Sequence, residues 1–328
     1  MLIFFSNYRN KKEKEKLNKE NIQIKQGVKI NFKNKKGLLI FINLTSEELM
    51  TKEGILKAQK LMFNYLDNNK EVTTVLLGAS TKRVFGKTGK KLKERYKNIL
   101  FTIGDNGTTY LLLKDISEKI KEKRLSKKSN FLVLGASGFL GEQVTKRLSK
   151  NGFENIYINT SSRKNSEIIK EKYKNTKIID KIEEANNIDM VIACTHSKNS
   201  LLTKEKIEKI KRKKNKLLII DVAEPTNLTE EEYEKSKEII EIRKAGNGYS
   251  NNIIYDKETE ITNESIKIPD NVAFGCFSEA LTLEKSQKYK DIDWFEISED
   301  RMEIIKKLFK ENKIETLPFN YIYGKILD

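Results

Sequence analysis

The chain has 328 residues, enough for two domains, and its 38% hydrophobic and 34% charged residues are typical of a soluble globular protein. No apolar run approaches the roughly 20 residues of a membrane-spanning helix, and the short start MLIFF lacks the form of a secretion signal, so we expect a cytoplasmic protein without a membrane span. Two cysteines and one histidine are too few for a disulfide framework and predict no metal site.

The formal net charge of +17 comes from lysines that run through the whole chain. They alternate with glutamates, as in residues 12–16 and 230–244, and this pattern is typical of solvated helix faces. No nucleic-acid-binding motif accompanies the charge, so we expect no nucleic-acid partner. A basic surface would instead attract an acidic protein partner.

The first 128 residues predict an α/β substrate domain. Strand-like runs occur at residues 36–44 and 73–79, and apolar residues recur at helical spacing over residues 46–69. A basic connector at residues 119–130 ends this part of the chain.

The following segment, residues 129–265, alternates short apolar runs with charged helical stretches. This alternation predicts a Rossmann-type, doubly wound parallel sheet covered by helices on both faces. The last segment, residues 266–328, reads as mostly helical, and we expect it to pack back on the substrate domain. The fold class is therefore α/β.

A glycine pattern opens the predicted parallel sheet. FLVLGASGFLGEQV places Gly135, Gly138 and Gly141 between a buried strand and a helix. The glycines allow a tight turn, a close approach to a pyrophosphate and close helix packing, and the helix start offers free N–H groups. The predicted cofactor contacts on this turn are Gly135, Ala136, Ser137, Gly138, Phe139, Leu140 and Gly141.

The next predicted strand favours NADPH over NADH. It ends in Ser161, Ser162, Arg163 and Lys164, without the acidic residue that would bind a ribose 2′-hydroxyl. Hydroxyl and basic groups suit a 2′-phosphate. At the carboxyl ends of later strands, Cys194, Thr195, Val222 and Ala223 are predicted to complete the cofactor site.

Cys276 has two interpretations. In AFGCFSEALTLE it falls in the first turn of a predicted helix, where the helix dipole favours a thiolate nucleophile. Taken alone, a cysteine among Phe, Ala and Leu is more often a core residue than a nucleophile. Cys194 and His196 follow a parallel strand, where they either border a ligand or serve as a packing residue and a loop residue.

The chain resembles the long-chain acyl-(acyl-carrier-protein) reductases, cytosolic enzymes that reduce fatty acyl thioesters to aldehydes with NADPH. The resemblance implies that Cys276 takes the acyl group as a thioester and that the glycine turn binds the cofactor. It extends from about residue 36 to 316 and is carried by LLGASTKRVFG (76–86), FTIGDNGTTY (101–110), VLGASGFLGEQV (133–144), LLIIDVAEPTNL (217–228), IPDNVAFGCFSEALTLE (268–284) and Trp294.

Two positions depart from that family. It usually carries histidine where Gly107 stands, and glycine and tyrosine where Ala223 and Glu224 stand. The acyl chain length therefore stays open. The nucleotide domain is also similar to glutamyl-tRNA reductase, another NADPH enzyme that works through a thioester, and to shikimate dehydrogenase.

The resemblance implies a mechanism with a covalent intermediate. Cys276 attacks a thioester of acyl-carrier protein or coenzyme A, and hydride from NADPH releases an aldehyde for a downstream aldehyde-consuming enzyme. Glu279 and His196 are candidates for a proton relay by their position in the sequence alone. Two alternatives stay open. One is a reductase of a keto, imino or amino-acid substrate without a covalent step, and the other is an NADPH-binding regulatory protein that is not an enzyme.

Overall fold

The computed structural model describes residues 1–286 and 288–327. The chain forms two compact units, each built from two separate stretches of sequence. Unit 1 consists of residues 1–110 and 247–317, and unit 2 of residues 111–246 and 318–328. Both are α/β, as predicted. No helix in the described part of the chain is long and apolar enough to cross a membrane.

Unit 1 is built on a mixed six-stranded sheet with β1 (Leu2–Tyr8) near its centre. β1 lies parallel to both of its neighbours, β3 and β4, and two antiparallel strands extend the sheet beyond β3. Across the sheet the strands are β13 (Ile253–Tyr255), β2 (Ile24–Phe32), β3 (Lys35–Thr45), β1, β4 (Thr74–Leu77) and β5 (Leu100–Thr102).

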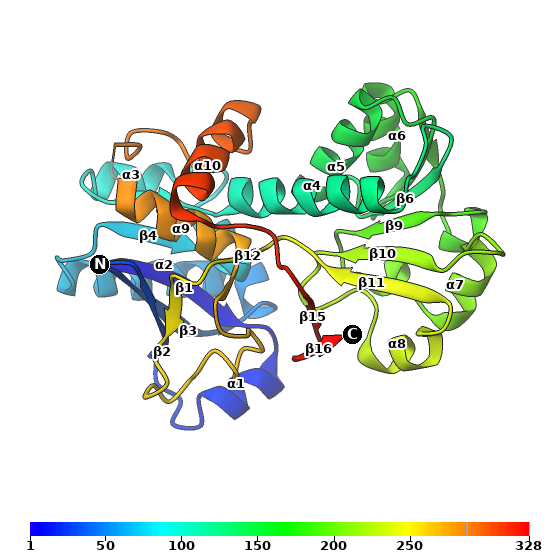
Figure 1. Ribbon diagram of the computed structural model, residues 1–328. Helices are drawn as coiled ribbons and strands as arrows, with labels where there is room; N and C mark the ends of the chain where they lie inside the picture. The colour runs from blue at the N-terminus through cyan, green and yellow to red at the C-terminus, as the bar shows by residue number, and fades with distance from the viewer. Residues whose placement is uncertain (287, 328) are drawn as a thin grey trace. The chain divides into compact units, whose positions relative to one another are not determined.

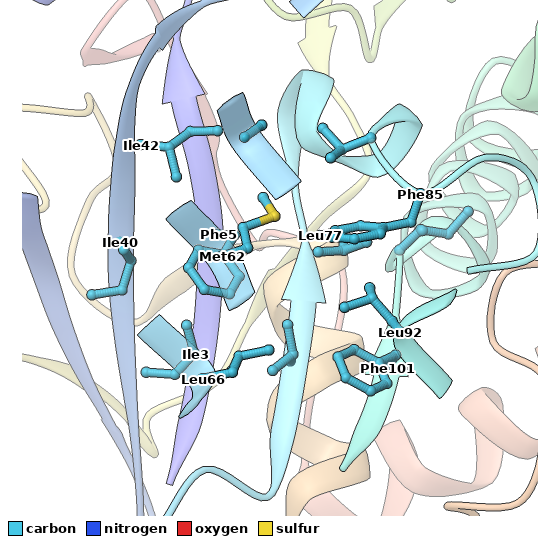
Figure 2. Close-up of a cluster of buried hydrophobic side chains, with 14 of the residues drawn as sticks. Ile3, Phe5, Ile40, Ile42, Met62, Leu66, Leu77, Phe85, Leu92 and Phe101 are labelled. Carbon is cyan, nitrogen blue, oxygen red and sulfur yellow. The ribbon is translucent and has the colours of Figure 1, made fainter. Parts of the chain in front are cut away.

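Alternate side chains of β1 enter two different cores. Ile3 and Phe5 pack with Met62 and Leu66 of helix α2 (Lys52–Asn68), in the cluster that Figure 2 shows. The intervening Phe4 stacks on Phe277 of helix α9 (Gly275–Ser286), with ring centroids 4.4 Å apart. The period of two in a strand therefore places α2 and α9 against opposite faces of the same sheet.

The remaining elements of unit 1 surround this sheet. Helix α9 contacts β1, β3 and β4 of the sheet and is packed in turn against α10. The other elements are α1 (Lys11–Leu17), η1 (Glu48–Met50), η2 (Ala79–Arg83), α3 (Lys90–Arg95), β12 (Asn247–Tyr249), β14 (Val272–Phe274) and α10 (Glu299–Asn312).

Unit 2 contains a six-stranded sheet in which every pair of neighbours is parallel (Figure 1). Taken in chain order, its strands lie 3-2-1-4-5-6 across the sheet, which is the doubly wound arrangement predicted. The strands are β6 (Asn130–Leu134), β7 (Asn155–Asn159), β8 (Thr176–Ile178), β9 (Met190–Ala193), β10 (Leu217–Asp221) and β11 (Ile240–Lys244).

Helices connect these strands, and a short hairpin ends the chain. The helical elements are α5 (Phe139–Lys150), α6 (Arg163–Lys172), η3 (Ile182–Glu184), η4 (Lys198–Ser200), α7 (Lys204–Ile210) and α8 (Glu230–Ser236), and the hairpin consists of β15 (Asn320–Ile322) and β16 (Lys325–Leu327).

Strand β11 corrects the prediction of one solvated helix over residues 230–244. Helix α8 ends at Ser236, and the chain then pairs with β10. Ile240 and Ile242 are buried, whereas Glu241 between them forms ion pairs with Lys119 and Lys123. The buried isoleucines recur at every second residue, which indicates a strand, but the surrounding Lys and Glu residues also suit a helix face.

The unit boundaries differ from those expected at residues 128 and 265. Helix α4 (Asp105–Glu122) is continuous and contributes residues to both units. Residues 247–265 belong to unit 1, because β13 pairs with β2. The chain end belongs to unit 2, where Arg243 Nη1 donates to the carbonyl of Phe319 at 2.7 Å. These are long-range pairings, which local composition does not encode.

Candidate functional site

The glycine turn of unit 2 connects β6 to α5. Gly135 has φ +79°, and a Cβ there would lie 2.8 Å from Cβ of Thr195. A Cβ on Gly141 would lie 2.2 Å from the Gly135 carbonyl oxygen, which is closer than two such atoms can approach. Helix and turn are therefore in backbone contact, and the seven residues predicted for the cofactor lie on this turn and in the first turn of α5.

The start of α5 fits a pyrophosphate. Gly138 is the residue before the helix, and as a glycine it has no side chain to cap the N–H groups of the first turn. These unsatisfied N–H groups and the positive end of the helix dipole form an anion site. Glu142, the acid of the first turn, is paired with Lys172 at 2.7 Å. The turn can therefore hold the pyrophosphate of a dinucleotide.

The loop after β7 carries the residues predicted for the adenosine ribose. Ser162 caps α6 by accepting a hydrogen bond from the Asn165 N–H, and Ser161 beside it is exposed. Arg163 is exposed and forms an ion pair of 3.1 Å with Asp180. The loop thus has hydroxyl groups and a guanidinium group, and its preference for NADPH stays a prediction.

A buried aspartate that sequence reasoning missed holds the loop after β10. Asp221 accepts hydrogen bonds from the N–H groups of Ala223 and Asn227, at 2.9 and 2.7 Å. Burial raises the pKa of Asp221 to about 6. Asn227 Nδ2 in turn donates to the carbonyls of Thr195 and Ser200, at 2.7 and 2.8 Å.

The loops after β9 and β10 are therefore tied together at the carboxyl edge of the sheet, where open α/β sheets bind ligands. Both Thr195 and Ala223 were predicted to border the cofactor, and Val222 lies between Asp221 and Ala223. Asp221 and Asn227 are the first and last residues of DVAEPTN (221–227), a segment that also carries the resemblance.

Cys194 and His196 lie on the β9 loop of unit 2. Burial raises the pKa of the Cys194 thiol, and the charge of Asp221 acts in the same direction, so this thiol stays protonated. His196 is exposed. Cys276 and Glu279 belong to unit 1, so the predicted proton relay through His196 stays a prediction.

Cys276 occupies the first turn of α9, as predicted. The loop between β5 and α4 packs directly on it. Gly104 has φ +72°, and a Cβ there would lie 2.2 Å from Cβ of Cys276. Because any larger residue would displace the helix, Gly104 determines how closely the loop approaches the cysteine.

The surroundings of Cys276 favour a protonated thiol, whereas the sequence predicted a thiolate. Burial raises the pKa of Cys276 to about 12, although the residue as a whole is only partly buried. Lys82 and the Phe277 N–H act to lower this pKa, and Asp105 and Glu279 act to raise it. Loss of hydration outweighs the helix N-terminus, and the thiol is protonated at neutral pH.

Glu279 lies one turn further along α9 and is fully buried. Its carboxyl group accepts hydrogen bonds from the Thr102 hydroxyl and, at 2.6 Å, from the Gly107 N–H. Burial nevertheless raises the pKa of Glu279 to about 7. A carboxyl group with this pKa exchanges protons near neutral pH, which is a property of catalytic acids and bases.

The contacts of Gly107 give a reason why this chain carries glycine where the acyl-(acyl-carrier-protein) reductases usually carry histidine. A Cβ on Gly107 would lie 2.6 Å from the Gly275 carbonyl oxygen and 2.7 Å from Cβ of Glu279. A histidine therefore does not fit here unless α4 and α9 move apart. In this chain the position serves as a close contact between the two helices.

Sequence reasoning assigned no role to an ion pair beside the cysteine. Lys82 of η2 and Asp105, the first residue of α4, are joined at 3.2 Å between Nζ and Oδ1. Both lie within segments quoted for the resemblance, but their proximity depends on the neighbouring ends of β4 and β5.

Comparison with known proteins gives one family match. Residues 94–242 match the family described as shikimate / quinate 5-dehydrogenase. A curated glutamyl-tRNA reductase from Methanosarcina mazei is 38% identical over 104 residues, which are 31% of this chain and 23% of that protein. The match thus spans about a quarter of the length of that relative.

Two solved structures share most of the chain at low similarity. L-tryptophan dehydrogenase from Nostoc punctiforme is 12% identical, covering 95% of this chain and 79% of its own, with a TM-score of 0.46. NAD-dependent malic enzyme from Thermotoga maritima is 13% identical, covering 95% and 83%, with a TM-score of 0.43. Neither likeness bears on function.

The matched residues include the glycine turn and the strands β6 to β10. Together with the uncapped helix start, this match identifies an NAD(P)-binding domain in unit 2. The family and the relative are named for other substrates than acyl-carrier thioesters, so the resemblance to the acyl-(acyl-carrier-protein) reductases stays a prediction.

Gly141→Ala tests the cofactor turn. The added Cβ collides with the Gly135 carbonyl and shifts α5 from the turn, so we expect NADPH binding to weaken at least about tenfold, or about 1.4 kcal/mol. The fluorescence of reduced nicotinamide measures the affinity. Arg147→Ala, an exposed change in the last turn of the same helix, is the control. Equal affinity in the two variants would contradict the assignment.

Glu279→Gln tests the raised pKa through stability. Between its ordinary value of 4.5 and about 7, the folded state binds more protons than the unfolded state, so the parent loses stability as pH rises through this window. The Gln variant lacks this loss, and the difference reaches on the order of 3 kcal/mol by pH 8.

Urea unfolding at pH 5, 6.5 and 8 measures this difference. Glu303→Gln, on the exposed side of α10, is the matched control because the Glu303 side chain is 62% exposed. A constant difference between the parent and Glu279→Gln across the three pH values would rule out the raised pKa.

Proposed function

We propose that this chain is an NAD(P)H-dependent reductase of an acyl thioester and that Cys276 carries the acyl group. The observation that carries the proposal is the surroundings of Cys276 in unit 1. The cysteine begins a helix, Gly104 packs on it, and a lysine and two carboxyl groups act on its sulfur. A packing cysteine requires none of these charged neighbours.

The chemistry divides reduction into two steps. The Cys276 sulfur attacks the acyl carbon, a new S–C bond forms, and the carrier leaves as a thiol with the proton that Cys276 loses. The N–H groups of the first turn of α9 can stabilise the developing oxyanion. Bound NAD(P)H would supply the hydride that converts the acyl group to an aldehyde, and the C–S bond would break to leave the Cys276 thiolate, which then takes up a proton.

Glu279 is suited to hold or release a proton during these steps. Its pKa of about 7 leaves both forms populated at neutral pH, and its hydrogen bonds to Thr102 and Gly107 fix its position. The carrier is acyl-carrier protein or coenzyme A in this proposal. The net charge of +17 attracts either carrier, because both are anionic, but this attraction is not specific to one of them.

A second function is favoured by the family match and by the protonated thiol. The matching family is named for dehydrogenation of shikimate and quinate. An oxidoreductase acting on a keto, imino or amino-acid substrate needs no thiolate, and a pKa of about 12 suits a cysteine without a covalent role. In that case Cys276 has a packing role, and Cys276→Ser retains most activity.

Intact-protein mass spectrometry separates the two functions. The protein is incubated with acyl-coenzyme A and acyl-carrier thioesters of several chain lengths, without nicotinamide cofactor. We expect one acyl adduct per chain, absent in Cys276→Ala and present in Cys194→Ala, because the chain has two cysteines. Addition of NADPH should remove the adduct and release the aldehyde.

Failure to form an adduct across the panel, in protein shown to bind NADPH, would exclude the acyl-enzyme. It would leave the non-covalent reductase, and turnover of keto and imino substrates would then be measured. NADPH binding without turnover of any substrate class would support the regulatory alternative.

Arg163→Ala tests the preference for NADPH. We expect Kd for NADPH to rise about tenfold and Kd for NADH to change less than about twofold, because only NADPH carries a 2′-phosphate. Titration of both cofactors measures the two constants. Arg147→Ala removes an exposed cation elsewhere in unit 2 and controls for net charge. An equal loss for both cofactors would contradict the proposed role of Arg163.

A further inference from the structure

The ion pair between Lys82 and Asp105 lies at the cysteine and was not part of the predicted site. Lys82 is on η2, which follows β4, and Asp105 follows β5 and Gly104. Gly104 packs on Cys276, so the same loop positions both the backbone contact and the ion pair. The pair is largely shielded from water, since the Asp105 side chain is 7% exposed and that of Lys82 33%.

The two members of the pair have opposite effects on the sulfur. The positive charge of Lys82 favours the thiolate, whereas the negative charge of Asp105 opposes it. Glu279, the third charged group that acts on the sulfur, comes from α9 itself and also opposes the thiolate. The three charged groups that act on this sulfur thus come from three different elements, η2, α4 and α9.

One oxygen of the pair is unsatisfied. Oδ1 of Asp105 accepts from Lys82, but Oδ2 is buried and has no hydrogen-bond partner among the described residues. A buried carboxylate oxygen without a donor is destabilising, because it has lost its hydrogen bonds to water and gained none in exchange. Asp105 Oδ2 is therefore an acceptor to which the described residues supply no donor, in the residue next to the Gly104 contact on Cys276.

We propose that the Lys82–Asp105 pair controls the reactivity of Cys276, and that an N–H or O–H donor of the bound substrate pairs with Asp105 Oδ2. A donor at this oxygen weakens the opposing negative charge, and Lys82 then dominates at the sulfur. The thiol is protonated and protected when no substrate is bound, and it becomes a better nucleophile when substrate arrives. This second part rests on the proposed thioester chemistry.

Alkylation of Cys276 by iodoacetamide tests the first part without any substrate. The thiolate is the reacting form, so the rate at pH 8 reports its population. Lys82→Met should slow alkylation about tenfold, the change that one pKa unit gives, and Asp105→Asn should accelerate it. Peptide mapping separates Cys276 from Cys194.

Controls distinguish charge from structural damage. Lys82→Arg keeps the positive charge and should retain most of the rate, and Arg83→Met removes the neighbouring exposed cation of η2 without effect. A damaged site would change the rates of Lys82→Met and Asp105→Asn in the same direction. The proposal would be overturned if Lys82→Met and Asp105→Asn changed the alkylation rate in the same direction, or if neither changed it. Thermal unfolding verifies that each variant folds.

The second part is tested by the KM of an acyl thioester that forms an adduct with the parent. Asp105→Asn should raise this KM about fivefold or more, because an amide nitrogen in place of Oδ2 repels a substrate donor. An unchanged KM would overturn the donor site while leaving the alkylation result valid. Absence of any adduct in the parent would instead count against the proposed function alone, since alkylation requires no thioester.

Discussion

The packing of α9 against one face of the unit 1 sheet is the contact on which the candidate site depends. The helix buries two carboxyl groups, Glu279 and Glu284, and each has specific donors. Glu279 is held by Thr102 and Gly107, and Glu284 by the hydroxyl groups of Thr73 and Thr74. Buried carboxyl groups are stable only when their oxygens are satisfied, so these bonds fix the rotation of α9 and thereby the direction of Cys276.

The same burial determines the chemistry of the site. Packing by Gly104 and Gly107 limits the access of water to the first turn of α9, which favours neutral forms of both Cys276 and Glu279. Positive charge from Lys82 acts against this effect at the sulfur. The ordinary argument that a helix N-terminus activates a cysteine therefore holds only where the sulfur keeps enough solvent or positive charge around it.

In unit 2, backbone groups and not side chains form the site that fits a dinucleotide. Its glycine turn brings α5 into contact with the end of β6, and Asp221 and Asn227 tie the loops after β10 and β9 together. Loops held by such hydrogen bonds present their N–H groups in fixed positions. The backbone therefore loses little conformational freedom when a cofactor binds.

The sequence by itself determined the α/β class, the doubly wound order of unit 2, the glycine turn and the helical first turn at Cys276. These features are local, because strand period, turn glycines and helix starts are written in neighbouring residues. Strand β11 was missed because its buried isoleucines alternate with charged residues inside a Lys- and Glu-rich run that also suits a helix face.

Only the tertiary structure decided the unit boundaries, the protonated state of Cys276 and the pairing of Lys82 with Asp105. Each depends on segments far apart in the chain: β13 beside β2, Gly104 on Cys276, and the end of β4 next to the end of β5. Burial and charge at one atom are sums over such long-range neighbours, so no local pattern of residues contains them.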